Sequence, residues 1–364
     1  MDIVRYALIG SGMMGHEHLR NLALIPGATV VAVSDPDESM RLSAQALAGE
    51  GCRAFADHRA LLDSVQCDAF LVVSPNHTHA AVLQDILPAG KPALVEKPLC
   101  STVADCKAVI ELAAEHKTPV WVAMEYRYMP PLQRLMAELA AGTAGALRMI
   151  SIREHRFPFL KKVGDWNRFS VNTGGTMVEK CCHFFDLMRL LAKAEPIRIY
   201  ASGAMDVNFQ NERYDGKKPD VIDNAFVIVD FANGVRAMLD LCMFAEGSFW
   251  QESISAVGDA ARIDALIPGP ARFSPEGKER ASEIVISPRA TKIERRETVH
   301  TDTAILAAGD HHGSTYFQHV KFNRLVREGG VPEVSLEDGL KAVMIGAAAE
   351  ESARTGRAAE LALP

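Results

Sequence analysis

The sequence predicts an α/β protein with two domains, the first on a parallel sheet and the second on a mostly antiparallel one. At 364 residues the chain exceeds the length of an average single domain. Strand-like and helical segments alternate through residue 124, which is typical of a doubly wound parallel sheet. Beyond residue 145 several strand-like segments follow one another instead. We therefore expect domains at residues 1–124 and 125–364.

The first domain is expected to contain five strands and four helices. The strands are expected at residues 3–9, 29–34, 68–74, 92–96 and 119–124, and the helices near 13–25, 37–48, 77–88 and 102–116. Asp37 and Ser101-Thr102 precede two of these helices as N-cap residues. The ligand crevice of such a sheet lies at the carboxyl ends of its strands. Because Ser74-Pro75-Asn76 and Glu96-Lys97-Pro98 directly follow strands, we expect both segments to line that crevice.

A glycine-rich segment, Gly10-Ser11-Gly12-Met13-Met14-Gly15, separates the first strand from the first helix. With an acidic residue, Asp35, at the end of the next strand, it has the pattern of a dinucleotide-binding βαβ unit. Gly10 permits the tight turn, Gly12 lets the backbone approach a pyrophosphate, and Gly15 lets the helix pack closely on the strand. The helix start at Met13 and Met14 offers unpaired N–H groups to phosphates.

Asp35 decides between two interpretations of this segment. A glycine-rich turn in an ordinary α/β domain is the alternative, and it does not require an acidic residue at this position. A carboxylate here would accept hydrogen bonds from the adenosine ribose hydroxyls and would repel a 2′-phosphate. The sequence therefore predicts NAD(H) as the cofactor, in preference to NADP(H).

The second domain is expected to contain several antiparallel strands and two helices. The strand-like segments lie at residues 147–155, 197–207, 222–232, 235–245, 249–257, 282–287 and 292–299, and the helices at 175–192 and 313–328. Asn233-Gly234 is a strong hairpin signal between two of these strands. An amphipathic C-terminal helix at 336–354 ends before Gly356 and is free to pack back on the first domain.

Composition excludes several classes of protein. The net charge is −7, and the basic doublets are isolated, which argues against nucleic-acid and anionic-membrane partners. No apolar run approaches the roughly 20 residues that span a bilayer. The first strand begins at residue 3, so we expect no signal peptide. The seven scattered cysteines contain no C-x-x-C pair and indicate a reduced, cytoplasmic protein, and the histidines lack metal-ligand spacing, so we expect no metal.

Two polar clusters are candidates for chemistry. Lys97 stands at the mouth of the expected crevice, where a lysine can hydrogen-bond a substrate hydroxyl, and we expect the Lys97–Pro98 peptide bond to be cis. The alternative is a solvated lysine at a strand end. Glu179 and His183 are four residues apart and share one face of the expected helix, with Asp186 close to the same stripe. A histidine beside a carboxylate suits a general base, although a core histidine bonded to Glu179 is the alternative.

Four motifs together resemble the glucose–fructose oxidoreductase/inositol dehydrogenase (Gfo/Idh/MocA) family. They are GSGMMG, PNHTH, EKP and the helix pattern GG-x-x-x-E-x-x-x-H-x-x-D, and the likeness runs through nearly the whole chain. The resemblance implies a Rossmann domain followed by an α/β domain on an open-faced sheet. That sheet often mediates oligomers in the family, so we expect a homo-oligomer formed through it.

The resemblance also implies roles for individual residues. Lys97 would hydrogen-bond the reacting hydroxyl and His183 would accept its proton, while hydride passes to the nicotinamide. The residues it places near the cofactor are Ser74, Asn76, His79 and Glu96. Glu179 stands where the family commonly has Asp, and Cys181 where it often has Gly.

A polar segment between the first strand of the second domain and the catalytic helix is the candidate substrate loop. Its residues are Arg153, His155, Arg156, Lys161, Lys162, Asp165, Trp166, Asn167 and Arg168. Trp166 could stack on the apolar face of a sugar, Asp165 could bind hydroxyls, and the basic residues could meet an anionic substituent. The alternative is a loop whose charges face water. Tyr126 and His155 are further candidates for acid–base chemistry and substrate contact.

The leading hypothesis is an NAD-dependent oxidoreductase that oxidises a secondary hydroxyl of a cyclic polyol, an inositol or a sugar. The second is a glycosidase that uses NAD⁺ transiently, through oxidation, elimination and hydration, on an anionic glycoside for example. A third, a non-catalytic NAD-binding regulator, would need Lys97 or His183 to be missing, and both are present. Production of NADH separates the first two.

Overall fold

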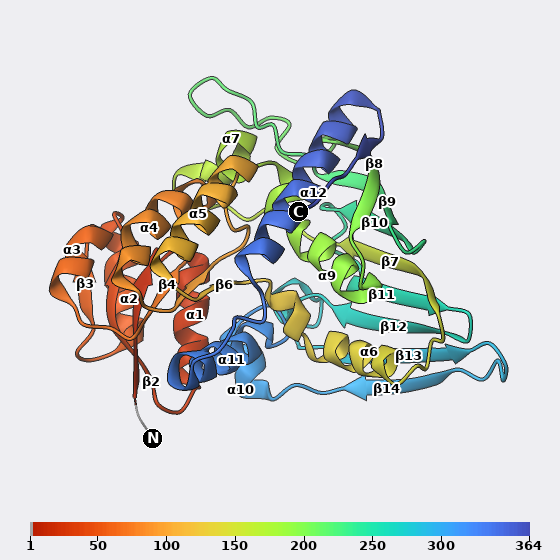
Figure 1. Ribbon diagram of the computed structural model, residues 1–364, viewed down its shortest axis with the longest axis horizontal. Helices are drawn as coiled ribbons and strands as arrows, with labels where there is room; N and C mark the ends of the chain where they lie inside the picture. Colours follow the sequence, from red (N-terminus) through yellow and green to blue (C-terminus); the bar gives the residue numbers. More distant parts are fainter. Residues whose placement is uncertain (1–2) are drawn as a thin grey trace.

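The computed structural model describes residues 3–364, which form two sheets joined and covered by helices (Figure 1). The first sheet has six parallel strands in the order β3-β2-β1-β4-β5-β6. They are β1 (Val4–Ile9), β2 (Ala28–Ser34), β3 (Arg53–Phe55), β4 (Ala69–Val72), β5 (Ala93–Val95) and β6 (Val120–Val122). The strand order reverses between β1 and β4, so the predicted doubly wound sheet is confirmed, with its switch point beside the glycine-rich segment.

The helices of the first domain follow the expected order, with one addition. They are α1 (Met13–Ala23), α2 (Glu38–Ala48), α3 (His58–Ser64), α4 (His79–Ile86) and α5 (Val103–His116). The side chains of Asp37 and Thr102 cap α2 and α5 by accepting hydrogen bonds from backbone amides, as predicted. The sequence analysis missed β3 and α3, because β3 has only three partly exposed residues and α3 buries a single side chain, Leu61. Neither is long enough to show a hydrophobic period.

The second sheet has nine strands in the order β14-β13-β12-β11-β7-β10-β9-β8-β15. They are β7 (Leu147–His155), β8 (Pro196–Ala204), β9 (Asn224–Phe231), β10 (Arg236–Cys242), β11 (Trp250–Gly258), β12 (Ala261–Pro268), β13 (Ser282–Pro288), β14 (Arg295–Val299) and β15 (Ala359–Glu360). β7 and β10 pair in parallel and the other neighbours are antiparallel, as expected. The Asn233-Gly234 hairpin is confirmed between β9 and β10. β12 was missed because most of its residues are buried and the alternation is lost.

Helices cover one face of the second sheet and leave the other open (Figure 1). The helices are α6 (Pro130–Ala140), α7 (Ser170–Thr173), α8 (Thr176–Glu179), α9 (Cys182–Ala192), α10 (Thr303–Ala308), α11 (Ser314–Glu328) and α12 (Leu336–Thr355). Short 3-10 turns lie at Asn76–Thr78, Leu87–Ala89, Glu125–Tyr128, Val163–Arg168 and Ala271–Phe273. Along β9, Val227 and Val229 are buried, whereas Phe226 and Ile228 are 63% and 52% exposed. This alternation confirms the open-faced sheet.

α11 and α12 come from the end of the chain and nevertheless pack on the first domain. Phe322 of α11 and Leu340 of α12 belong to the same apolar core as the first sheet. Further along α12, Ile345 and Ala349 belong to the core of the second domain. α12 therefore bridges the two domains, and Figure 1 shows it lying between them.

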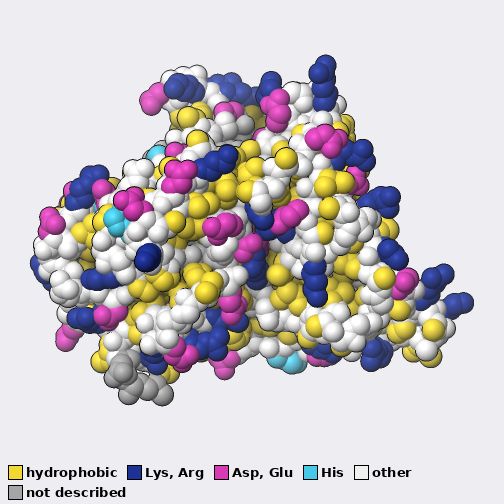
Figure 2. Space-filling view, viewed as in Figure 1, with side chains coloured by type: hydrophobic (Ala, Val, Ile, Leu, Met, Phe, Trp, Pro, Cys, Tyr) yellow, Lys and Arg dark blue, Asp and Glu magenta, His cyan; other side chains and the backbone are white. Residues whose placement is uncertain are grey.

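The surface and the cysteines agree with the composition. Figure 2 shows basic side chains interspersed with acidic ones on the face in view. Within residues 3–364, no helix is long and apolar enough to cross a membrane. All seven cysteines are free and six are buried, which fits a packing role for Cys181 and Cys182. No group of three or more His, Cys, Asp or Glu side chains in the described chain is arranged to hold a metal ion.

Candidate active site

A cleft of about 950 Å³ lies at the carboxyl ends of the first sheet. The glycine-rich segment, Asp35, the Ser74–Thr78 segment and Lys97 line it from the first domain. Lys161, Lys162, Gly164 and Trp166 close it from the second domain. The cleft thus joins the two candidate motifs of the first domain to the polar loop of the second.

The glycine-rich segment fits a dinucleotide. A Cβ at Gly10 would lie 2.4 Å from the Ser74 amide nitrogen, and one at Gly15 would lie 2.7 Å from the Gly10 carbonyl oxygen. A Cβ at Gly12 would meet nothing within 4 Å, because this residue faces the open cleft beside Met13 and Met14. α1 begins at Met13, and no side chain of the described residues caps its first turn. Its amides are available to phosphate oxygens. Gly15 itself does not line the cleft and serves close packing.

Asp35 lies in the cleft, where its carboxylate could accept hydrogen bonds from the adenosine ribose hydroxyls. Its carboxylate lines the cleft and accepts hydrogen bonds from the amides of Ser11 (2.7 Å) and Asp37 (2.9 Å). These bonds fix the carboxylate beside the glycine-rich turn. Each oxygen can still accept a further bond from a hydroxyl.

The other predicted cofactor residues divide into two groups. Ser74, Asn76 and Glu96 line the cleft, and the Asn76 Nδ2 atom has no hydrogen-bond partner in the described chain. His79 does not line it. The ring nitrogens of His79 lie 2.9 Å from the carbonyl oxygens of Ser74 and Pro98, so this buried side chain holds the two crevice segments together.

Lys97 lines the cleft and reaches the second domain. The Lys97–Pro98 bond is cis, as predicted. The Lys97 Nζ atom donates a hydrogen bond to the Glu179 carbonyl oxygen at 3.3 Å. Burial opposes its charge, but the neighbouring Cys182 and the carboxylates of Glu96 and Glu179 raise its pKa. Lys97 is therefore a half-buried cation on the wall of the cleft, bonded to the second domain instead of being fully solvated.

The expected helix at 175–192 is interrupted, and this separates Glu179 from His183. The Cys181 amide bonds to the Thr176 carbonyl oxygen five residues back, so the turn between α8 and α9 holds one extra residue. One extra residue rotates α8 by about 100° relative to α9. The expected single face is lost. Glu179 instead turns to Lys162, whose Nζ atom lies 3.9 Å from Glu179 Oε1.

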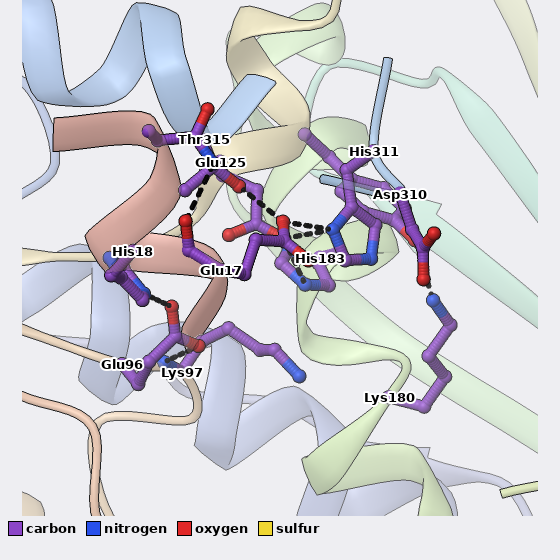
Figure 3. A network of polar contacts seen from close by, with 12 residues as sticks. Glu17, His18, Glu96, Lys97, Glu125, Lys180, His183, Asp310, His311 and Thr315 are labelled. Atoms are coloured by element: carbon purple, nitrogen blue, oxygen red, sulfur yellow. Dashed lines mark hydrogen bonds and ion pairs between the residues drawn. The ribbon is translucent and has the colours of Figure 1, made fainter. Parts of the chain in front are cut away.

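His183 is 2% exposed and contacts the Glu125–Tyr128 turn that follows β6 (Figure 3). Its ring stacks on Tyr126 with a centroid separation of 4.1 Å. His183 Nε2 lies 3.9 Å from Glu125 Oε1, the one carboxylate within 4 Å of the ring nitrogens in residues 3–364. His183 Nδ1 has no partner among these residues. Burial, followed by the charges of Lys97 and Lys180, holds the pKa of His183 well below its usual value, so the ring is neutral.

Of the expected substrate residues, the structure brings Tyr126 to His183 and Trp166 to the cleft. The Tyr126 hydroxyl accepts a hydrogen bond from Lys180 Nζ at 2.6 Å, and burial raises the pKa of Tyr126 well above its usual value. It is therefore no base. Trp166 packs edge-on against His77 on the cleft wall. Asp165 does not line the cleft, and its carboxylate lies 3.8 Å from Lys161 Nζ.

His155 and Asp186 lie away from the site. His155 points to the opposite face of β7 from the buried Glu154, because side chains alternate along a strand, and its Nε2 atom lies 3.0 Å from Asp240. Asp186 accepts two hydrogen bonds from Arg127, at 2.6 and 2.5 Å, and does not approach His183. His183 and Asp186 both lie on α9, three residues apart, but its two hydrogen bonds direct the Asp186 carboxylate to Arg127 and away from His183.

Comparison with known proteins identifies the family. Residues 4–124 match the family model described as the NAD-binding Rossmann fold of an oxidoreductase family (Gfo/Idh/MocA), and residues 137–361 match its C-terminal alpha/beta domain. The chain belongs to the Gfo/Idh/MocA oxidoreductase family. Its first domain is accordingly an NAD-binding domain, as the cleft and Asp35 indicate.

The relatives of this Gfo/Idh/MocA chain include inositol dehydrogenases. An inositol 2-dehydrogenase of Acidothermus cellulolyticus is 30% identical over 98% of this chain and 94% of its own length. The rhizopine catabolism protein MocA of Rhizobium meliloti is 29% identical, over 54% of this chain and only 59% of MocA. Levoglucosan dehydrogenase, solved with NADH, has the same fold, with a TM-score of 0.82, 20% identity and complete coverage of both chains.

Several buried charged residues of this family member escaped the sequence analysis. Behind His183 lie Glu17, Glu125 and His311, and beside Tyr126 lie Lys180 and Glu154 (Figure 3). Glu125 could have been predicted as a site residue from its position three residues after β6, because the carboxyl ends of all strands of the sheet meet at the crevice. Lys180 lay within the motif itself, as an ionisable residue in an apolar stretch.

Proposed function

We propose that this protein is an NAD-dependent dehydrogenase that oxidises a secondary hydroxyl of a cyclic polyol, an inositol or a sugar. The observation that supports it best is a neutral, buried His183 whose pKa is lowered by burial and by the nearby ammonium of Lys97, a residue that lines the NAD-binding cleft. A neutral imidazole can accept a proton and an ammonium can stabilise a developing oxyanion.

Each residue then has a distinct role. The glycine-rich turn, the start of α1 and Asp35 would hold the dinucleotide, and NAD⁺, when bound, supplies the hydride acceptor. The Lys97 ammonium orients the substrate oxygen by donating to it, as it now donates to the Glu179 carbonyl oxygen. His183 Nδ1 is buried without a partner in the described chain, so the other ring nitrogen, Nε2, accepts the hydroxyl proton. His183 is buried and Lys97 is half-buried, which strengthens their electrostatic effect on the substrate.

Similarity to inositol 2-dehydrogenases supports a polyhydroxylated substrate.

The glycosidase alternative is not favoured. The family matches are to oxidoreductases, and relatives that cover 98% of the chain include inositol 2-dehydrogenases.

A substrate screen tests the proposal. Purified protein is incubated with NAD⁺ and, separately, inositols, aldoses and aryl glycosides, while NADH absorbance and released aglycone are recorded. NADH that accumulates with an inositol or an aldose is the expected result. Release of aglycone without net NADH would contradict it, as would a lack of turnover with every polyol.

The open face of the second sheet supports assembly of a homo-oligomer. Met149, Tyr200, Phe226, Ile228 and Met238 are exposed on β7–β10 and together form an apolar surface. Light scattering after size-exclusion chromatography should give a mass above that of one chain. The Ile228→Glu variant, which charges the middle of this face, should lower the mass. A monomeric wild-type protein would contradict the proposal.

A further inference from the structure

We propose that Glu125, not Glu179, is the carboxylate that takes the second ring proton of His183 during oxidation of the substrate. This inference rests on the dehydrogenase function proposed above. Glu125 begins the turn after β6, directly beyond the NAD-binding domain, so a residue of the connection between the domains would complete the acid–base machinery.

The geometry forms a chain of groups from His183 outward (Figure 3). Glu125 Oε1 lies 3.9 Å from His183 Nε2 and 3.6 Å from His311 Nδ1. His311 Nδ1 lies 3.2 Å from Glu17 Oε1, which also accepts a hydrogen bond from the Thr315 hydroxyl at 2.9 Å. The first two distances are longer than hydrogen bonds. Catalytic contacts are often long without substrate and shorten in the reacting complex.

Glu125 has the environment of a proton acceptor instead of a structural carboxylate. Its side chain is 1% exposed, and neither oxygen has a hydrogen-bond partner in the described chain. A structural carboxylate this deeply buried would be hydrogen-bonded. The charged groups that face it are Glu17 of α1, Glu96 and Lys97 after β5, His183 of α9 and His311 before α11. Burial, with the nearby Glu96 and Glu17, raises the pKa of Glu125 to about 7.

The proton and electron balance requires such an acceptor. The substrate O–H bond breaks and its proton joins His183 Nε2, and NAD⁺, when bound, would supply the acceptor for the C–H hydride. A second proton on the ring is disfavoured by burial and by the nearby cations. The new Nε2–H bond therefore breaks as the proton moves on to Glu125 Oε1, and the ring returns to its starting neutral tautomer. His311, whose side chain is 21% exposed, then releases one proton to water and takes the proton of Glu125 in its place.

Glu179 cannot take this role in the observed arrangement. The extra residue in the turn at Cys181 directs its carboxylate to Lys162, on the cleft side of the motif. The two carboxylates therefore have different partners, Lys162 for Glu179 and His183 for Glu125, and substitutions at each should separate their effects.

The test compares Glu125→Gln with Glu179→Gln and with Glu283→Gln, a control at an exposed ion pair on β13. We expect Glu125→Gln to lower kcat by about 10²-fold, within the range for loss of an acid–base group. In the wild type, kcat should rise with pH through about 7 as Glu125 ionises, and this limb should vanish in Glu125→Gln. Glu125→Asp, which keeps the acid, should retain the limb at a lower kcat. A Glu125→Gln enzyme with wild-type kcat and pH profile would overturn the inference.

Histidine NMR on the protein without substrate gives a readout independent of turnover. In ¹⁵N-labelled wild type, the Nδ1–H tautomer of His183 should dominate, and Glu125→Gln should shift the tautomer ratio, whereas Glu283→Gln should not. Identical His183 spectra in wild type and Glu125→Gln would overturn the inference even if no substrate is turned over. If the wild type makes NADH while Glu125→Gln is unaffected, only this inference fails. If no polyol is oxidised, the proposed function fails by itself.

Discussion

Lys97 Nζ donates a hydrogen bond to the carbonyl oxygen of Glu179 at 3.3 Å, which joins the end of β5 to the break between α8 and α9. The same carbonyl oxygen accepts a contact from Cys182 Sγ at 3.5 Å, at the start of α9. One residue further along α9, His183 Nε2 lies 3.9 Å from Glu125 Oε1. The contacts of Lys97 and His183, the two groups expected to act on the substrate, therefore meet at the break between α8 and α9.

Substitution of Lys97 should remove turnover and spare the fold. Lys97→Met keeps the length of the side chain and loses the ammonium that would orient the substrate oxygen. We expect kcat/KM to fall by about 10²–10⁴-fold, the range for loss of a group that stabilises charge in the transition state. Steady-state kinetics with the substrate found in the screen provides the measurement. A Lys97→Met enzyme whose kcat/KM lies within tenfold of the wild-type value would exclude this role, since tenfold corresponds to only about 1.4 kcal/mol of activation free energy.

Substitution of His183 should affect catalysis and leave cofactor binding nearly intact. His183 belongs to α9, whereas the expected cofactor contacts come from the first domain. His183→Ala should therefore lower kcat by about 10²–10⁴-fold. Titration calorimetry should give an NAD⁺ affinity close to wild type. Near-normal turnover would contradict the assignment of His183 as the base, and His155 could not replace it, because it faces the other side of β7.

Local sequence patterns predicted the parts of this protein that local geometry determines. The glycine-rich turn, Asp35 at the end of β2 and Lys97 at the end of β5 depend on residues within one βα unit, whose geometry is nearly fixed. The Asn233-Gly234 hairpin is equally local. These features could therefore be predicted from the sequence without knowledge of how the domains pack.

The surroundings of His183 depend on tertiary structure and could not be predicted in this way. A helical period of 3.6 places Glu179 beside His183. A single extra residue in the turn moves them apart, and no pattern in the sequence indicates that residue. His311 reaches Glu125 only because α10 and α11 return to the first domain at the end of the chain. Glu17, on α1, joins them through the same packing. Ion pairs between such distant segments have no periodic signature.

Cofactor preference should depend on Asp35. A 2′-phosphate would meet a carboxylate that is already fixed by the amides of Ser11 and Asp37, so NAD⁺ should bind more tightly than NADP⁺. Asp35→Ser should reduce the ratio of the two dissociation constants by about tenfold, equivalent to about 1.4 kcal/mol. Fluorescence titration with both dinucleotides measures it. Equal affinities in the wild type would contradict the prediction.

The ion pair of Arg127 and Asp186 should be a determinant of stability. Asp186 is fully buried and accepts both hydrogen bonds from a nearly buried guanidinium. Asp186→Ala leaves that charge without its main partner, and the free energy of unfolding should fall by about 3–5 kcal/mol. Urea denaturation followed by circular dichroism measures the change. The control is Asp230→Ala, which removes the partner of the exposed Arg198, and it should cost below about 1 kcal/mol.

The pair of His311 and Glu17 should make stability depend on pH in a defined direction. Burial opposes the charge of both groups, but each stabilises the other, so the pKa of His311 rises to about 9 and that of Glu17 falls to about 2. A raised histidine pKa means that the folded protein holds the proton more tightly. Its stabilisation is therefore complete below about pH 6.5 and is lost as the pH rises through 9. The depressed pKa of Glu17 affects stability at acid pH, where its stabilisation of the fold is lost as the pH falls from about 4.5 through 2.

Comparison with His311→Gln isolates this effect from the other titrating groups. The difference in unfolding free energy between wild type and variant should be largest near pH 5–6.5 and should shrink steadily as the pH approaches 9. Urea titrations at a series of pH values measure it. His300→Gln, which changes a histidine on the segment before α10, is the matched control and should show no such trend. A His311→Gln difference that stays constant from pH 6 to 9, or grows, would mean that His311 is neutral and that the pair is not ionic.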